Sequence, residues 1–212
     1  MGVARKQLGV VALVPGLALM TVPAAAQSAP LFPAQVSQAN IDCLFGVQCA
    51  ITPHDETTEI PLPGITGTAV LQSRTIEAPG GSRAEGWTAY EYRVDLRNAT
   101  TTVDFSCLLN LSIEFGPVAK LPYAPGTILR DVYEITQGVP ANQIGFSAAQ
   151  QTGDVVTFTF ARPIYAADAS SPGGSSFAFG LASLHAPVRG VRVQMDGLGI
   201  EDIPVKSFGP RR

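Results

Sequence analysis

Charged residues are scarce in this chain, and Asp, Glu, Lys and Arg fill only 15% of its 212 positions. Histidine and cysteine are rarer still, with two and three copies, whereas glycine and proline together occur 38 times, as 21 and 17 residues. This composition disfavours long, charge-rich helices and favours short strands joined by many turns. Because the net charge is −3 rather than strongly positive, nucleic acid is not expected as a partner.

Long apolar runs are also missing, apart from one at the start of the chain. Arg5 and Lys6 precede an apolar segment over residues 8–22, and small residues up to Ala26 close it. This order predicts a cleavable signal peptide over residues 1–26. Pro15 and Gly16 interrupt the run, which disfavours an uncleaved membrane anchor. We therefore expect a secreted or periplasmic protein with no membrane span after processing.

The rest of the chain has the length of one domain with a sizeable core. It carries 12 basic and 17 acidic residues, a net charge of −5. We divide it into an extended segment (27–67), a β-sandwich domain (68–206) and a short polar tail (207–212). Prolines exclude a long helix from the extended segment, and we expect parts of it to pack as edge strands.

Two stretches alternate between apolar and polar residues with the period of a β-strand. From Thr88 to Arg97 the even positions are expected to be buried and the odd positions to face water. From Thr102 to Phe115 the odd positions, including Cys107 and Leu109, are expected to form the buried face. Further strands are expected at residues 68–77, 128–136, 155–162, 176–183 and 188–195, and one short helix near residues 142–150.

Turn residues separate these strands at spacings typical of antiparallel sheets. The sequence therefore predicts an all-β fold, an antiparallel β-sandwich that is Ig-like or jelly-roll-like. A parallel α/β architecture is excluded because it needs a crossover helix between strands.

Three cysteines in an exported chain leave one without a partner. Cys43 and Cys49 flank Gly46, which can supply the chain reversal that brings their sulfurs together, and we favour this disulfide. A bond from either to Cys107 would close a longer loop and stabilise more, about 4 against about 2 kcal/mol. We expect Cys107 to be a buried free thiol, because it lies on the apolar face of its strand.

Carboxylates and histidines do not form a recognisable catalytic pattern. His54, Asp55 and Glu56 could bind a cation or move protons, but a solvated loop is the simpler interpretation. An enzyme acting on polysaccharide would need two acids across a cleft. The strands offer four candidates, which we expect on water-facing surfaces: Glu91, Asp95, Asp104 and Glu114. His185 lies near Ser183, but there is no GxSxG turn for acyl transfer.

Metal sites are weakly supported. No CxxC pair or Asp-x-Asp-x-Asp-Gly loop occurs, so no cofactor or zinc site is predicted. A structural calcium ion remains an alternative, because five acidic residues lie near expected strand ends: Asp154, Asp168, Asp196, Glu201 and Asp202. The competing interpretation is that these carboxylates accept hydrogen bonds from backbone amides of turns.

Aromatic rings could bind sugars by stacking, and four fall outside the clearest buried alternation: Trp87, Tyr123, Tyr133 and Tyr165. We expect an exported, non-catalytic binding module for a glycan or a surface protein. The alternatives are a secreted enzyme acting on polysaccharide, or a structural matrix subunit that associates through its sheet edges. Residues 87–97, 115–118 and 175–183 also resemble segments of bacterial exported proteins, a resemblance that assigns no catalytic or ligand residue.

Overall fold

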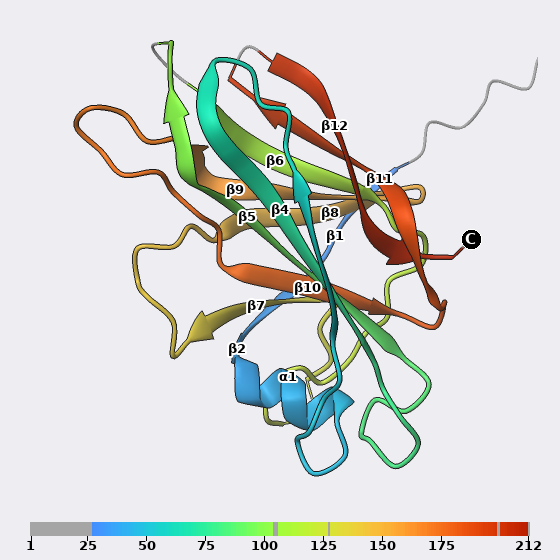
Figure 1. Ribbon diagram of the computed structural model, residues 1–212. Coiled ribbons are helices and arrows are strands. Elements are labelled where there is room, and N and C mark those ends of the chain that lie inside the picture. Colours follow the sequence, from blue (N-terminus) through green and yellow to red (C-terminus); the bar gives the residue numbers. More distant parts are fainter. Residues whose placement is uncertain (1–26, 104–105, 127, 199, 212) are drawn as a thin grey trace, which may run out of the picture.

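The protein is a sandwich of two six-stranded β-sheets (Figure 1). We describe a computed structural model that covers residues 27–103, 106–126, 128–198 and 200–211. The predicted signal peptide and Asp104 lie outside the described residues. Sheet A has the strand order β1-β8-β9-β6-β11-β12, and sheet B has the order β2-β7-β10-β5-β4-β3. All neighbours are antiparallel except β2 and β7, which run parallel. The predicted all-β sandwich is confirmed.

The strands of sheet A are β1 (Ser28–Pro30), β8 (Phe146–Thr152), β9 (Val155–Tyr165), β6 (Cys107–Glu114), β11 (Pro187–Gly197) and β12 (Ile200–Pro210). Those of sheet B are β2 (Pro33–Ser37), β7 (Val132–Gln137), β10 (Ala178–Ser183), β5 (Thr88–Thr101), β4 (Ile65–Glu77) and β3 (His54–Glu59). Three strands of the N-terminal segment, β1, β2 and β3, lie at sheet edges, as the sequence predicted.

Two elements depart from the predictions at residues 142–150 and 207–212. No helix forms near residues 142–150, where β8 begins at Phe146 and pairs with β9. The expected polar tail also contributes to the sandwich, because residues 207–210 end strand β12 and are buried. Tyr92 donates a hydrogen bond across the core from its hydroxyl to the Phe208 carbonyl, at 2.9 Å, and so ties this strand to sheet B.

The main core lies between the two sheets and takes the even side chains of β5, as predicted. Tyr90, Tyr92 and Val94 are all at most 1% exposed, and Tyr90 packs edge-on against Phe115 with ring centroids 5.3 Å apart. The alternation predicted for residues 102–115 fails both before and within β6. Val103, expected on the buried face, is 54% exposed, and Ser106 is buried. A bulge between Leu108 and Asn110 shifts the register, so that Leu108 is buried and Leu109 is only half-buried.

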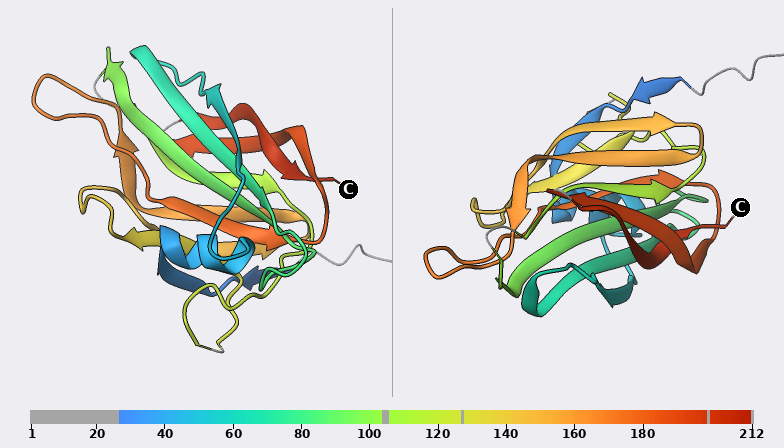
Figure 2. Two further views of the ribbon diagram at one scale, coloured as in Figure 1. Left: turned by 60° about the horizontal axis from the view of Figure 1, so that its bottom comes forward. Right: turned by 90° about the horizontal axis from the view of Figure 1, so that it is seen from above.

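The outer face of sheet B is covered as well, by the helix α1 (Gln38–Phe45) and neighbouring loops (Figure 2). Ser37 caps this helix, since its hydroxyl accepts from the Asn40 amide and the Asn40 side chain accepts from the Ser37 amide. Apolar side chains at positions 41, 44 and 45 pack on the sheet, which is the spacing of one helical face. The helix spans two turns, too short for its periodicity to stand out in the sequence.

The predicted disulfide is confirmed: Cys43 and Cys49 are bonded, and Cys107 is free and buried. Gly46, between the two bonded cysteines, has no room for a side chain, since a Cβ there would lie 2.2 Å from the Ala50 carbonyl oxygen. The bond fixes the C-terminal end of α1 against the loop that follows it.

Removing this bond with the double variant Cys43→Ser/Cys49→Ser should lower the free energy of unfolding by about 2 kcal/mol, because the closed loop is short. Urea denaturation of the variant and the parent measures the difference. Reductant should destabilise the parent by the same amount and leave the variant unchanged, since its remaining thiol, Cys107, is already free. An unchanged parent under full reduction would contradict the prediction.

Candidate functional site

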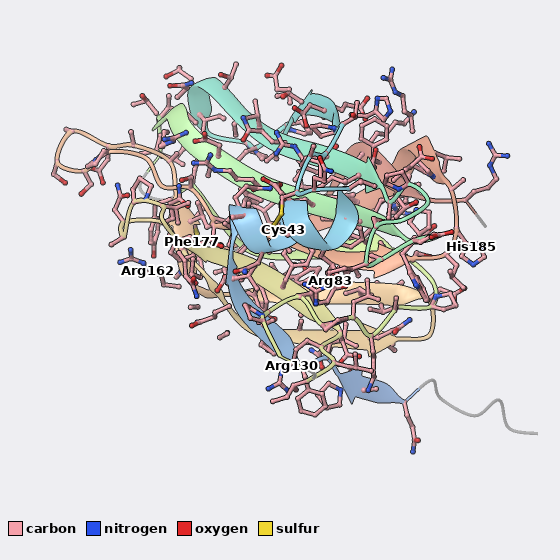
Figure 3. All side chains as sticks on the ribbon, turned by 90° about the horizontal axis from the view of Figure 1, so that it is seen from below. Cys43, Arg83, Arg130, Arg162, Phe177 and His185 are labelled. Atoms are coloured by element: carbon pink, nitrogen blue, oxygen red, sulfur yellow. A yellow bond between two sulfur atoms is a disulfide. The ribbon has the colours of Figure 1, made fainter. Side chains whose placement is uncertain are left out.

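The candidate site is a pocket of about 350 Å³ on the outer face of sheet B, beside the first turn of α1. Its base is formed by strands β3, β4 and β5, with β7 and β10 on one side. Gln38 of α1 and the segment 138–145, through Val139 and Gln143, form its rim. Figure 3 views this side of the molecule and shows α1, marked by Cys43, in front of the strands.

A row of side chains crosses five strands at one level of the sheet. Asp55 pairs with Arg74, and Arg74 with Glu91, on neighbouring strands. Glu91 is opposite Gly180, which is opposite Tyr133. Residues directly opposite one another project from the same face of a sheet, so this row projects toward α1 and the pocket.

Gly180 makes the long reach across this row possible. A Cβ at this position would lie 2.4 Å from the Tyr90 carbonyl oxygen and 2.6 Å from the Tyr133 hydroxyl. The absent side chain therefore leaves the space in which the Tyr133 ring crosses strand β10. From there the Tyr133 hydroxyl donates to a Glu91 carboxylate oxygen at 3.5 Å.

Glu91 is the buried carboxyl group of the row, with a residue exposure of 7%. Burial raises its pKa to about 7, although Arg74, at 3.9 Å, and the Tyr133 hydrogen bond both favour the ionised form. The pKa of Tyr133 is raised well above its usual value, chiefly by burial, so this hydroxyl stays a neutral donor. Glu91 can therefore exchange a proton near neutral pH.

Asp55 has the opposite electrostatic environment. Both of its carboxylate oxygens accept hydrogen bonds from the Arg74 guanidinium, at 2.6 and 3.1 Å. This interaction lowers the pKa of Asp55 and raises that of Arg74. Arg74 is thus neutralised mainly by Asp55, and Asp55 stays ionised at neutral pH.

Arg93 lies one step further along β5, on the same face as Glu91, and lines the pocket with Gln72 and Thr57 from β4 and β3. Its Nε atom is buried, with no hydrogen-bond partner among the described residues. Its one hydrogen bond in this part of the chain is long, from Nη2 to the Ser175 hydroxyl at 3.5 Å. Burial and nearby Arg97 lower the pKa of Arg93, which forms no salt bridge within the described ranges.

These positions correct the expectation that the odd residues of β5 face water. Glu91 and Asp95 are 7% and 8% exposed, because α1 and the loops cover this face of the sheet. Asp95 accepts hydrogen bonds from the Arg97 side chain at both oxygens. Glu114 is exposed, as predicted.

Two of the four predicted stacking aromatics cannot stack on a ligand. Tyr123 and Tyr133 are at most 1% exposed and pack against each other, with ring centroids 4.9 Å apart. Both rings fill the core beneath α1 instead of lying on the surface. Trp87 is half-buried against the same core, and Tyr165 is 43% exposed; neither lines the pocket.

The other candidate residues are spread over the molecule. Strand β3, not a loop, holds His54, Asp55 and Glu56. Asp55 and Glu56 line the pocket, and His54 does not. His185 is exposed beyond the end of β10, at the opposite end of the sandwich from Phe177 (Figure 3). Its own amide donates to the Ser183 hydroxyl, so the pair forms a turn.

The acidic residues weighed as calcium ligands form no common metal site among the side chains that the structure describes. Asp168 accepts from the Ser170 and Ser171 amides, the turn chemistry weighed against a metal site. Asp196 likewise accepts from the Asp202 amide, and the side chain of Glu201 lies outside the described residues. The part of the chain that the structure describes holds no group of three or more His, Cys, Asp or Glu side chains placed to bind a metal ion.

Sequence reasoning named Glu91 and Asp55, but separately, and it missed Arg74, Arg93 and Gln72. The sequence did hold one clue: Glu91 and Arg93 are both odd positions of an alternating strand, so their charged side chains lie on the same face. Comparison with known proteins adds no assignment: no known protein family matches the chain, and no curated protein or solved structure is significantly similar to it. None of the described helices is long and apolar enough to cross a membrane.

Proposed function

We propose that the protein is an exported, glycan-binding β-sandwich module and that its binding site is the pocket on the outer face of sheet B. The observation that carries the proposal is the buried Nε of Arg93, a pocket-lining residue, which has no hydrogen-bond partner among the described residues. A buried donor without a partner costs free energy, which an anionic ligand would recover. The confirmed disulfide is in keeping with an oxidising compartment.

Other side chains that line the pocket favour a sugar over an apolar ligand. Gln38, Gln72 and Gln143 offer amide donors and acceptors, and Thr57 adds a hydroxyl. Three apolar side chains line one side: Ile135, Val139 and Ala178. A volume of about 350 Å³ lies at the small end of ligand sites, so one or two sugar units fit better than a long stretch of polymer. The ligand is therefore a glycan with a negatively charged substituent.

The test is a glycan array of acidic and neutral sugars, followed by affinity measurement on the hits. Arg93→Gln should weaken binding of an acidic hit about 10- to 100-fold, because it removes a charge-assisted contact. Arg97→Gln is the matched control, since Arg97 lies on the same strand and face, is paired with Asp95, and does not line the pocket. Binding that is equal in both variants, or confined to neutral sugars, would refute the site.

A further inference from the structure

Glu91 and Arg93 place a titratable carboxyl group and an unpaired cation in one pocket. They are two residues apart on β5, hence about 7 Å apart along the strand and on the same face. Both line the pocket; Glu91 is buried, and Arg93 is half-buried with its Nε atom withdrawn from water. A ligand carboxylate bound by Arg93 would therefore hold the carbon next to it within reach of Glu91.

Resting on the proposed glycan-binding function, we propose that Glu91 is the acid–base residue of a β-elimination that cleaves glycans at a 1,4-linked uronic acid. In such a sugar the carboxylate is attached to C5, and the glycosidic oxygen leaves from C4. Neutralising that carboxylate makes the C5 proton more acidic, because the charge that develops on proton loss is spread onto the carboxyl group. Arg93 supplies the neutralising charge.

The step balances without a further reactant. The Glu91 carboxylate takes the proton from C5, and the electron pair of that C–H bond forms the C4=C5 double bond. The C4–O bond breaks, its electrons go to the leaving oxygen, and Glu91 returns the proton to that oxygen. The products are a saturated reducing end and an unsaturated uronate, and Glu91 is again ionised.

The surroundings of Glu91 suit both halves of this cycle. Arg74 faces it from β4, the Tyr133 hydroxyl from β7, and the carboxylates of Asp55 and Asp42 from β3 and α1. Arg74 favours the ionised base, whereas burial and the two carboxylates favour the protonated acid. With its pKa at about 7, Glu91 is able to accept and return a proton at neutral pH.

The experiment uses the purified protein with oligosaccharides of 1,4-linked uronic acid. Product is followed by the ultraviolet absorbance of the new double bond and by mass, since elimination gives a fragment one water lighter than hydrolysis. The rate should rise with pH to a plateau, with a midpoint near 7 as Glu91 ionises. Glu91→Gln should lower the rate at least about 100-fold while the oligosaccharide still binds.

Glu59→Gln is the matched control, because Glu59 is an exposed carboxylate of β3 outside the pocket, and its rate should equal that of the parent. Binding without an unsaturated product would overturn the elimination and leave the binding function standing. So would a saturated product, or an undiminished rate in Glu91→Gln. If no acidic glycan binds, the binding proposal fails, and the elimination fails with it.

Discussion

Replacing Gly180 by alanine is expected to lower the free energy of unfolding by about 3 kcal/mol or more. The added methyl group would meet the Tyr90 carbonyl oxygen at 2.4 Å and the Tyr133 ring and hydroxyl at 2.6 Å. The carbonyl belongs to the paired strand β5 and cannot move without breaking the sheet. Tyr133 is fully buried and packs against Tyr123, with ring centroids 4.9 Å apart. Overpacking of such a site costs about 1–3 kcal/mol, and the rigid backbone contact adds to it.

Urea denaturation measures the loss, and Gly80→Ala is its control. A Cβ at position 80 would meet only the end of the Glu85 side chain, at 3.8 Å, so that variant should differ from the parent by less than about 0.5 kcal/mol. The Gly180 variant should also lower the elimination rate if it still folds, because displacing Tyr133 disturbs Glu91. Equal stability of the two variants would show that Gly180 is not needed for the Tyr133 crossing.

The stability of the protein should fall with rising pH because of Glu91, by up to about 3 kcal/mol. Its pKa is about 7 in the folded state against an ordinary value of 4.5, and each pKa unit corresponds to about 1.4 kcal/mol. Below pH 4.5 the group is protonated in both states, so the penalty of burying its charged form does not arise. As the pH rises toward 7 the unfolded chain ionises more readily, and the stability contribution is lost.

The measurement compares the parent with Glu91→Gln, whose amide does not titrate, by urea denaturation at pH 4 and pH 8. The stability of Glu91→Gln relative to the parent should increase by about 3 kcal/mol between these pH values. Taking this difference cancels the titration of groups that both proteins share. Glu59→Gln, which changes an exposed carboxylate, should show almost no such increase. A relative stability that is the same at both pH values would mean that Glu91 has an ordinary pKa.

Local sequence patterns predicted much of the sandwich, but they did not predict which strand faces other parts of the chain would cover. The alternation from Thr88 to Arg97 identified β5 and its inner face, because Tyr90 and Tyr92 face the core. It could not show that the outer face is also covered, since α1 and the loops that bury Glu91 come from distant parts of the chain. The end of strand β12 was missed because residues 207–212 were interpreted as a polar tail, whereas residues up to Pro210 pair with β11.

By itself, the sequence determined the β-rich class, the edge strands of the N-terminal segment and the Cys43–Cys49 disulfide. Each depends on residues close together in the chain, whose alternation, turn propensity or spacing is local. Only the tertiary structure decided the candidate site. Asp55, Arg74, Glu91 and Tyr133 meet because four strand pairings align them in one row, and Gly180 contributes by lacking a side chain. Such neighbours are set by long-range strand register, which no local pattern encodes.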